Sequence, residues 1–81
     1  NPEFDLKNLK AYPNPVTDVL SISYSENIVS VEVFNLIGQK IMDKTTNTTQ
    51  VTINLSDVET GAYLVRVSSG KAQKTFRILK K

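Results

Sequence analysis

Carboxylates are the main candidates for catalytic acids, bases or metal ligands in this chain, because its 81 residues include no histidine and no cysteine. Without those residue types, the common nucleophile–base pairs and most transition-metal sites are excluded. Two carboxylates could hydrolyse a glycosidic bond, but only across a cleft that holds a sugar, which so small a domain rarely provides. We therefore expect no enzymatic activity. The acids are Glu3, Asp5, Asp18, Glu26, Glu32, Asp43, Asp57 and Glu59.

Asp57 and Glu59 lie close together in a turn-forming segment and offer oxygen ligands for calcium. Two carboxylates are too few for a dedicated calcium site, so a solvated turn is the expected structure. No other cluster of ligands stands out along the chain. The sequence therefore predicts a domain that needs no metal and no cofactor.

Cationic side chains are concentrated in the last part of the chain. Residues 60–81 contain six cations and no acid, whereas residues 1–59 hold four cations and eight acids, so the formal net charge of +2 conceals a basic end. Such an asymmetry can steer docking to a partner, although edge-strand lysines can also serve only to block aggregation. Nucleic acid would need exposed aromatics or a broad cationic groove, so no nucleic-acid partner is expected.

The elements that must position these groups are short runs in which apolar and polar residues alternate, the pattern of half-buried strands. Turn-forming residues separate the runs, with at most one helical turn at 56–59. About seven strands at this spacing predict an all-β, antiparallel β-sandwich. The strands are expected at 9–12, 19–24, 29–34, 40–42, 51–55, 63–68 and 71–78, and the turns at 13–15, 25–27, 35–38, 45–50, 56–61 and 69–70.

The length of the chain allows one domain with one core. We expect residues 9–81 to form it and residues 1–8 to be a cloning remnant or linker, because Pro-Glu-Phe is a frequent vector-derived sequence. No apolar stretch approaches the ~20 residues that span a bilayer. Pro13 and Pro15 lack amide hydrogens and predict an extended crossing or a rigid turn, not a central strand. Gly61 predicts a positive φ where a Cβ would clash.

The segment Tyr12-Pro13-Asn14-Pro15 resembles the opening of the type A C-terminal sorting domain of the type IX secretion system. Further matches follow in the same order: residues 31–34 leading into Leu36-Ile37-Gly38, then residues 61–67, and finally Gly70-Lys71 with residues 74–81. Asn35 stands where the family often has Asp, and Arg77 stands where Lys is common. The resemblance covers residues 9–81.

This resemblance implies a noncatalytic, immunoglobulin-like sandwich at the end of a secreted cargo protein. In that family the domain crosses the periplasm and is carried by shuttle proteins and a translocon of the outer membrane. A sortase-like cysteine peptidase then usually removes it, and the cargo is left at the cell surface or secreted. The residues expected to form the sorting motif are Pro13, Asn14, Pro15, Gly38, Gly61, Tyr63, Val65, Val67, Lys74, Arg77, Lys80 and Lys81.

The terminal strand combines an apolar face with a row of cations, so it could add to the edge of a partner's strand while its charges set orientation. A strand of this kind without its partner could also support a weak homodimer through a strand edge. We expect Lys80 and Lys81 to lie at its frayed end. Reversing both charges is then expected to cost well under ~1 kcal/mol.

The alternative interpretation is an immunoglobulin-like accessory module that binds carbohydrate or protein through its loops. Phe34, Tyr63 and Phe76 lie in or beside apolar alternations, which places them in the core. Tyr12 and Tyr24 are then the exposed pair that could stack on a sugar.

Overall fold

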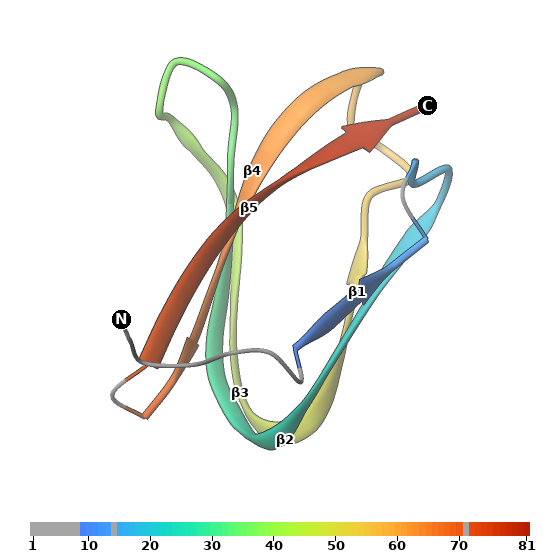
Figure 1. Ribbon diagram of the computed structural model, residues 1–81. Helices are drawn as coiled ribbons and strands as arrows, with labels where there is room; N and C mark the ends of the chain where they lie inside the picture. The colour runs from blue at the N-terminus through green and yellow to red at the C-terminus, as the bar shows by residue number, and fades with distance from the viewer. Residues whose placement is uncertain (1–8, 14, 71) are drawn as a thin grey trace.

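The computed structural model describes residues 9–13, 15–70 and 72–81, and these form one curled antiparallel sheet of five strands (Figure 1). The strands are β1 (Lys10–Tyr12), β2 (Val19–Phe34), β3 (Lys40–Asn54), β4 (Gly61–Ser69) and β5 (Ala72–Lys80). Their order is β1-β2-β4-β5, and β3 pairs with β2 as well. The predicted all-β class is confirmed. The proposed remnant or linker at residues 1–8, together with Asn14 and Lys71, lies outside the described residues.

The number of strands differs from the prediction, because two expected turns are bends within continuous strands. β2 runs through residues 25–27 and β3 through residues 45–50, with register shifts on either side of Ile28. At the bend, the Asn27 side-chain amide donates to the Asn47 side-chain oxygen at 2.9 Å, and the Thr46 hydroxyl donates to the Ile28 carbonyl. Polar residues that favour turns thus hold two strands together here.

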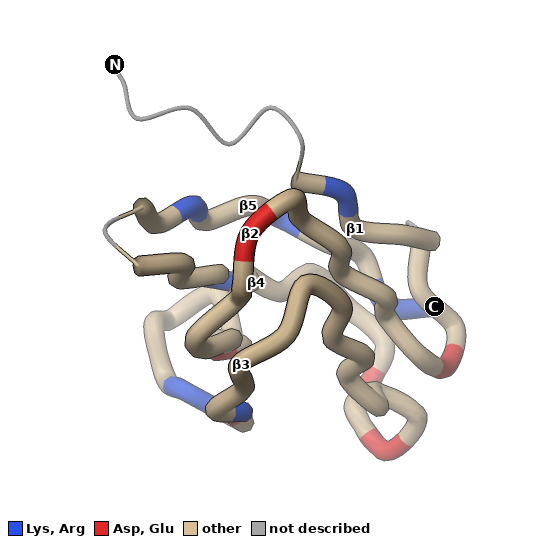
Figure 2. Tube along the Cα trace, turned by 90° about the horizontal axis from the view of Figure 1, so that it is seen from below, with Lys and Arg blue, Asp and Glu red and all other residues tan. Residues whose placement is uncertain are grey.

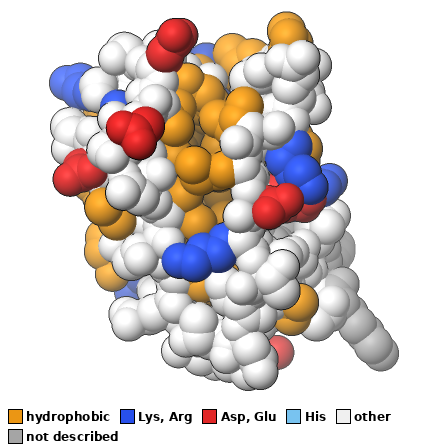
Figure 3. Space-filling view, turned by 180° about the vertical axis from the view of Figure 1, so that it is seen from behind, with side chains coloured by type: hydrophobic (Ala, Val, Ile, Leu, Met, Phe, Trp, Pro, Cys, Tyr) orange, Lys and Arg blue, Asp and Glu red, His pale blue; other side chains and the backbone are white. Residues whose placement is uncertain are grey.

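The curl of the sheet folds its two halves over a shared core. The inward side chains of β2 and β3 before and after the bend meet those of β4 and β5, as the period-two alternation predicts. Each such side chain stabilises the fold by about 1.5–3 kcal/mol relative to exposure. Hydrophobic side chains also gather in a hollow on the back of the molecule (Figure 3). The core comprises Val16, Leu20, Ile22, Ile28, Val31, Val33, Val51, Ile53, Leu55, Val65, Val67 and Ile78.

The remaining turns lie where the sequence places them, after β2, after β3 and between β4 and β5. Gly38 has a φ of 89° and Gly61 a φ of 154°, which are backbone conformations that L-residues rarely adopt. The positive φ expected at Gly61 is confirmed, but the expected clash is wrong, because nothing lies within 4 Å of a Cβ built there. Among the described residues there is no helix long and apolar enough to cross a membrane.

Candidate functional site

The end of β5 is held in place by Val16, a residue of the segment between β1 and β2. The Val16 amide donates to the Leu79 carbonyl at 2.7 Å, and the Lys81 amide donates to the Val16 carbonyl at 2.8 Å. These bonds make a parallel bridge between Val16 and Lys80, and Val16 is fully buried. The expectation of a frayed end is therefore wrong. Sequence reasoning missed Val16, although a lone apolar residue directly after Pro15 is a usable signal of anchoring.

Lys80 is part of the interior of the domain and not of its cationic surface. It is only 5% exposed. Its ammonium group donates to the carbonyl of Val58 at 3.0 Å and to that of Lys81 at 3.3 Å. A buried ammonium group is tolerated only where acceptors replace water, and these carbonyls do so. Lys80 thus ties β5 to the turn at 56–59. The low cost expected for its charge reversal assumed an exposed side chain at a frayed strand end, and that assumption is wrong.

The other predicted cations are exposed, but they do not form a row. In the β4–β5 register Lys74 lies opposite Val67, which is buried, whereas Arg77 lies opposite Leu64. An odd separation along a strand places Lys74 and Arg77 on opposite faces. Lys81 follows the end of β5. Figure 2 likewise shows the cations spread over several elements.

Three of the remaining residues of the expected motif, Tyr63, Val65 and Val67, hold the frame that carries β5. Val65 and Val67 of β4 belong to the core. The Tyr63 hydroxyl donates to the Glu59 carbonyl at 2.7 Å, which closes the turn before Gly61. By contrast, Pro13 and Pro15 are exposed between β1 and Val16. The arrangement separates the motif residues that hold the fold from the exposed motif residues that a partner can reach.

Sequence reasoning also missed a group of charges across β2, β3 and β4. Arg66 lies opposite Glu32, and its Nε and Nη2 atoms are 2.8 and 2.7 Å from the Glu32 Oε1 atom. Lys40 bridges Glu32 at 3.5 Å and Asp43 at 3.0 Å. The Arg66 guanidinium also lies 5.0 Å from the centre of the Phe34 ring, within the range of a cation–π interaction. Only the cross-strand register reveals this group.

The pKa of Glu32 lies below its ordinary value of 4.5, chiefly because Arg66 donates to its carboxylate. Partial desolvation opposes this shift, and attraction to Arg66 and Lys40 adds to it. The pKa of Lys40 is raised above 10.5, first by its hydrogen bond to Asp43 and then by attraction to that carboxylate. The charged forms of both residues are therefore favoured in the folded state.

Glu32 should make the domain sensitive to acid. A carboxyl group with a lower pKa in the folded chain stabilises the fold above the unfolded value of 4.5, and that contribution disappears as the pH falls through the folded value. Glu32→Gln should therefore lower the melting temperature at pH 7. Below pH 4.5 the melting temperatures of the variant and the unchanged domain should approach each other. Glu26→Gln, at an exposed residue of the bend, is the control. Melting curves are measured by circular dichroism from pH 2 to 7. A difference in melting temperature between Glu32→Gln and the unchanged domain that stayed the same at every pH would show that the Arg66 contact contributes nothing.

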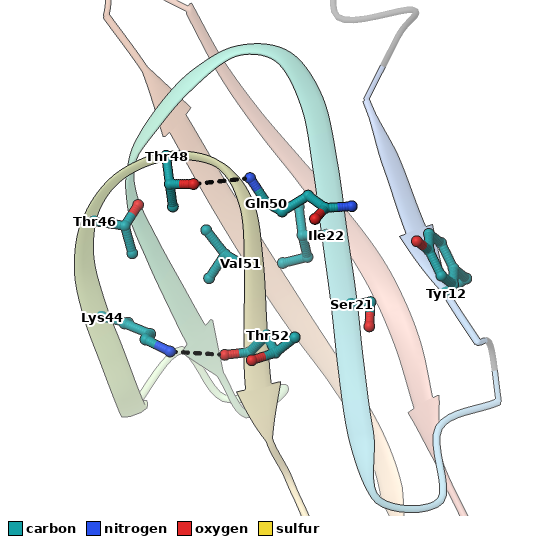
Figure 4. Close-up of a pocket in the computed structure, with 9 residues that line it drawn as sticks. All are labelled: Tyr12, Ser21, Ile22, Lys44, Thr46, Thr48, Gln50, Val51 and Thr52. Carbon is teal, nitrogen blue, oxygen red and sulfur yellow. Dashed lines mark hydrogen bonds between the residues drawn. The ribbon is translucent and has the colours of Figure 1, made fainter.

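A hollow of about 330 Å³ lies beside the bend and is the candidate place for a carbohydrate in the alternative interpretation. Figure 4 shows Tyr12 on one side of β2 and the threonines of β3 on the other, with Lys44 donating to the Thr52 carbonyl at 2.9 Å. Tyr24 is half-buried and packs against the core, whereas Tyr12 is exposed. The expected pair of exposed tyrosines is therefore wrong. Within the described part of the chain, no three His, Cys, Asp or Glu side chains group to hold a metal ion.

Comparison with known proteins assigns this chain to a family. A family model described as "Secretion system C-terminal sorting domain" matches residues 10–81. The ulvan lyase NLR42 of Nonlabens ulvanivorans is 31% identical over an alignment of 67 residues, and the match covers 79% of this chain and 12% of the lyase. The solved structure of PorZ, titled an essential bacterial surface component of the type-IX secretion system of Porphyromonas gingivalis, matches with a TM-score of 0.75 and 26% identity, over 94% of this chain and 12% of PorZ.

The chain thus spans about an eighth of either relative, while the family model runs from β1 through β5. The resemblance drawn from the Pro-Asn-Pro segment and the strands that follow it is confirmed. The chain belongs to the family of type IX secretion C-terminal sorting domains.

Proposed function

We propose that this chain is the noncatalytic secretion signal of a larger protein and directs that attached cargo through the type IX secretion system to the cell surface. The observation that carries the proposal is the family match over residues 10–81. Two relatives support it, because one is named a lyase and the other a secretion-system component, yet both match over only 12% of their length. A short module shared by otherwise different proteins is what a transport signal requires.

The finer architecture that we propose is an immunoglobulin-like β-sandwich formed by residues 9–81, with residues 1–8 as a cloning remnant or linker. The bends of β2 and β3 support the sandwich, since each strand contributes one segment to either half of the curled sheet. If the parts of β2 and β3 before and after the bend are counted separately, they supply four segments, and β1, β4 and β5 supply three more, which gives the seven strands expected of the sandwich. This is consistent with the likeness to part of PorZ.

The route that we propose takes the domain through the periplasm, with shuttle proteins and the outer-membrane translocon as partners. At the cell surface a sortase-like cysteine peptidase removes it. Partner contact falls to the exposed members of the sorting motif, and the other described members hold the frame; the exposed members are Pro13, Pro15, Gly38, Lys74, Arg77 and Lys81. A weak homodimer through an open strand edge remains part of the proposal, supported by β3, which pairs with β2 alone in the described residues.

Export of a reporter tests the main proposal. The reporter carries a secretory signal at its N-terminus and residues 1–81 at its C-terminus, and is expressed in a bacterium that has the type IX system. Surface proteolysis and fractionation should place most of the fusion at the surface, and at least tenfold less in a strain without the translocon. The reporter without residues 1–81 is the control and should stay in the periplasm. Equal surface amounts with and without the domain would refute the function.

The same experiment checks removal of the domain. If a peptidase cleaves it off, the surface form should be smaller than the periplasmic form by close to the 9.0 kDa of this chain. Mass spectrometry of the two forms measures that difference. A surface form of full length would contradict cleavage while leaving export itself intact.

A further inference from the structure

The turn between β2 and β3 presents two large aliphatic side chains to solvent. Ile37 is 80% exposed and Leu36 is 58% exposed, more than any other large hydrophobic side chain of the described residues. In Figure 1 this turn, drawn in green, projects from the body of the molecule. Single exposed hydrophobics are normal on a protein surface, but two adjacent ones at the tip of a projecting turn make a compact apolar knob.

The knob is held by a dense set of hydrogen bonds from Asn35. Its side-chain oxygen accepts from the amides of Ile37 at 3.1 Å and Gln39 at 2.9 Å, and its side-chain amide donates to the Gln39 side chain at 2.9 Å. The Asn35 amide donates to the Gln39 carbonyl at 2.9 Å, and Gly38 turns the chain with a φ of 89°. A side chain displayed on a preorganised turn binds without a large entropic cost of ordering.

The strands beneath the knob continue it as an apolar row with a cation at each end. In the register, Lys40 lies opposite Phe34, Phe34 opposite Leu64, and Leu64 opposite Arg77. Phe34 and Leu64 are half-buried. Lys40 is neutralised by Glu32 and Asp43, whereas Arg77 has no ion pair among the described residues. One end of the row therefore offers an uncompensated positive charge.

We propose that Leu36 and Ile37, with the row from Phe34 to Arg77, form the surface that docks onto a protein of the export machinery. This inference rests on the proposed function. The partner surface has an apolar pocket that receives the Ile37 side chain and a carboxylate that pairs with Arg77. Among the four residues of the row, Arg77 is the one cation unpaired within the described part of the chain, and attraction to anionic headgroups relies on clusters of unpaired cations. A single carboxylate of a protein partner therefore complements this surface better than a lipid surface does.

The test uses the reporter fusion with Ile37→Asn, Leu36→Asn and Arg77→Glu, singly and together. Val29→Asn is the matched control, because Val29 is an aliphatic residue of β2 that is 44% exposed and lies outside the knob and the row. The knob variants should lower surface export at least tenfold, and the control should leave it within twofold. Melting temperatures of all variants should stay within a few degrees. If Ile37→Asn melts lower, Ile37→Thr keeps the branched shape and replaces it.

The outcomes separate this inference from the function on which it rests. If the unchanged domain is not exported, the proposed function fails. If it is exported and the folded knob variants are exported equally well, the docking surface is wrong. Cosedimentation with vesicles of three parts phosphatidylethanolamine to one part phosphatidylglycerol, lost on Ile37→Asn, would make the occupant a membrane. Sedimentation showing a dimer that depends on Ile37 would make it a second copy. Either result would overturn the assignment to a protein partner.

Discussion

Lys80→Glu is expected to destabilise the domain by about 3 kcal/mol or more, which corresponds to a fall in melting temperature of roughly 12–24 °C. The substitution puts a carboxylate where an ammonium group now donates to the Val58 and Lys81 carbonyls, in a site that is 5% exposed. A carboxylate cannot donate, and it would face two oxygen atoms at short range. Urea and thermal unfolding followed by circular dichroism measure the loss.

Two comparisons show which property of Lys80 matters. Lys81→Glu makes the same charge change at the next residue, which is exposed, and should shift stability by no more than about 0.5 kcal/mol. Lys80→Met keeps an apolar stem and leaves the Val58 carbonyl unpaired, so it should cost about 1–2 kcal/mol. Equal effects of Lys80→Glu and Lys81→Glu would show that the buried ammonium group stabilises nothing.

Loss of residues 72–81 is expected to abolish export, but through unfolding. The deletion removes β5, uncovers the edge of β4 and takes Ile78 out of the core. Removing a buried isoleucine side chain alone costs about 2–5 kcal/mol, a large part of the stability of a small domain. Circular dichroism should show loss of the folded spectrum together with loss of surface cargo. A truncated domain that stayed folded and was still exported would deny β5 any role.

Substitution of the exposed cations tests partner recognition without unfolding the domain. Lys74→Glu, Arg77→Glu and Lys81→Glu in combination avoid the core and should cost less than about 1 kcal/mol. If these charges orient the domain on its partner, surface export of the reporter should nevertheless fall at least tenfold. Normal export of the folded triple variant would leave these cations as solubilising residues only.

The period-two alternation of the sequence predicted most strand segments and most of their inward faces. It was wrong at the bend, where Ile28 is buried and Val29, which the alternation places on the face of Val31 and Val33, is 44% exposed. Leu20, Ile22, Val65 and Val67 all lie in the core as that alternation predicts. It was not sufficient to locate the chain's bends. The segments at 25–27 and 45–50 are rich in turn-forming residues, but their hydrogen bonds are made to each other across two strands. Local composition cannot distinguish a turn from a bend that a neighbouring strand stabilises.

The candidate site was less accessible to prediction, because its contacts join residues far apart in the chain. Lysine is nearly always exposed, and nothing near Lys80 in the sequence announces that its acceptor is Val58, 22 residues away. The ion pair of Arg66 with Glu32 spans 34 residues. Glycine and asparagine at Gly38 and Asn35 did mark the turn, but its exposed knob became recognisable only once the burial of each side chain was known.

The continuous course of β2 has a consequence for how the domain comes apart. β2 pairs with β1, β3 and β4, and its residues reach both halves of the curled sheet. Neither half can lose its order without releasing the strand on which the other is built. We expect unfolding to be all-or-none, with amides before and after the bend of β2 exchanging with deuterium at one common, slow rate. A receptor would then encounter the complete docking surface or none of it, with no half-formed signal in between.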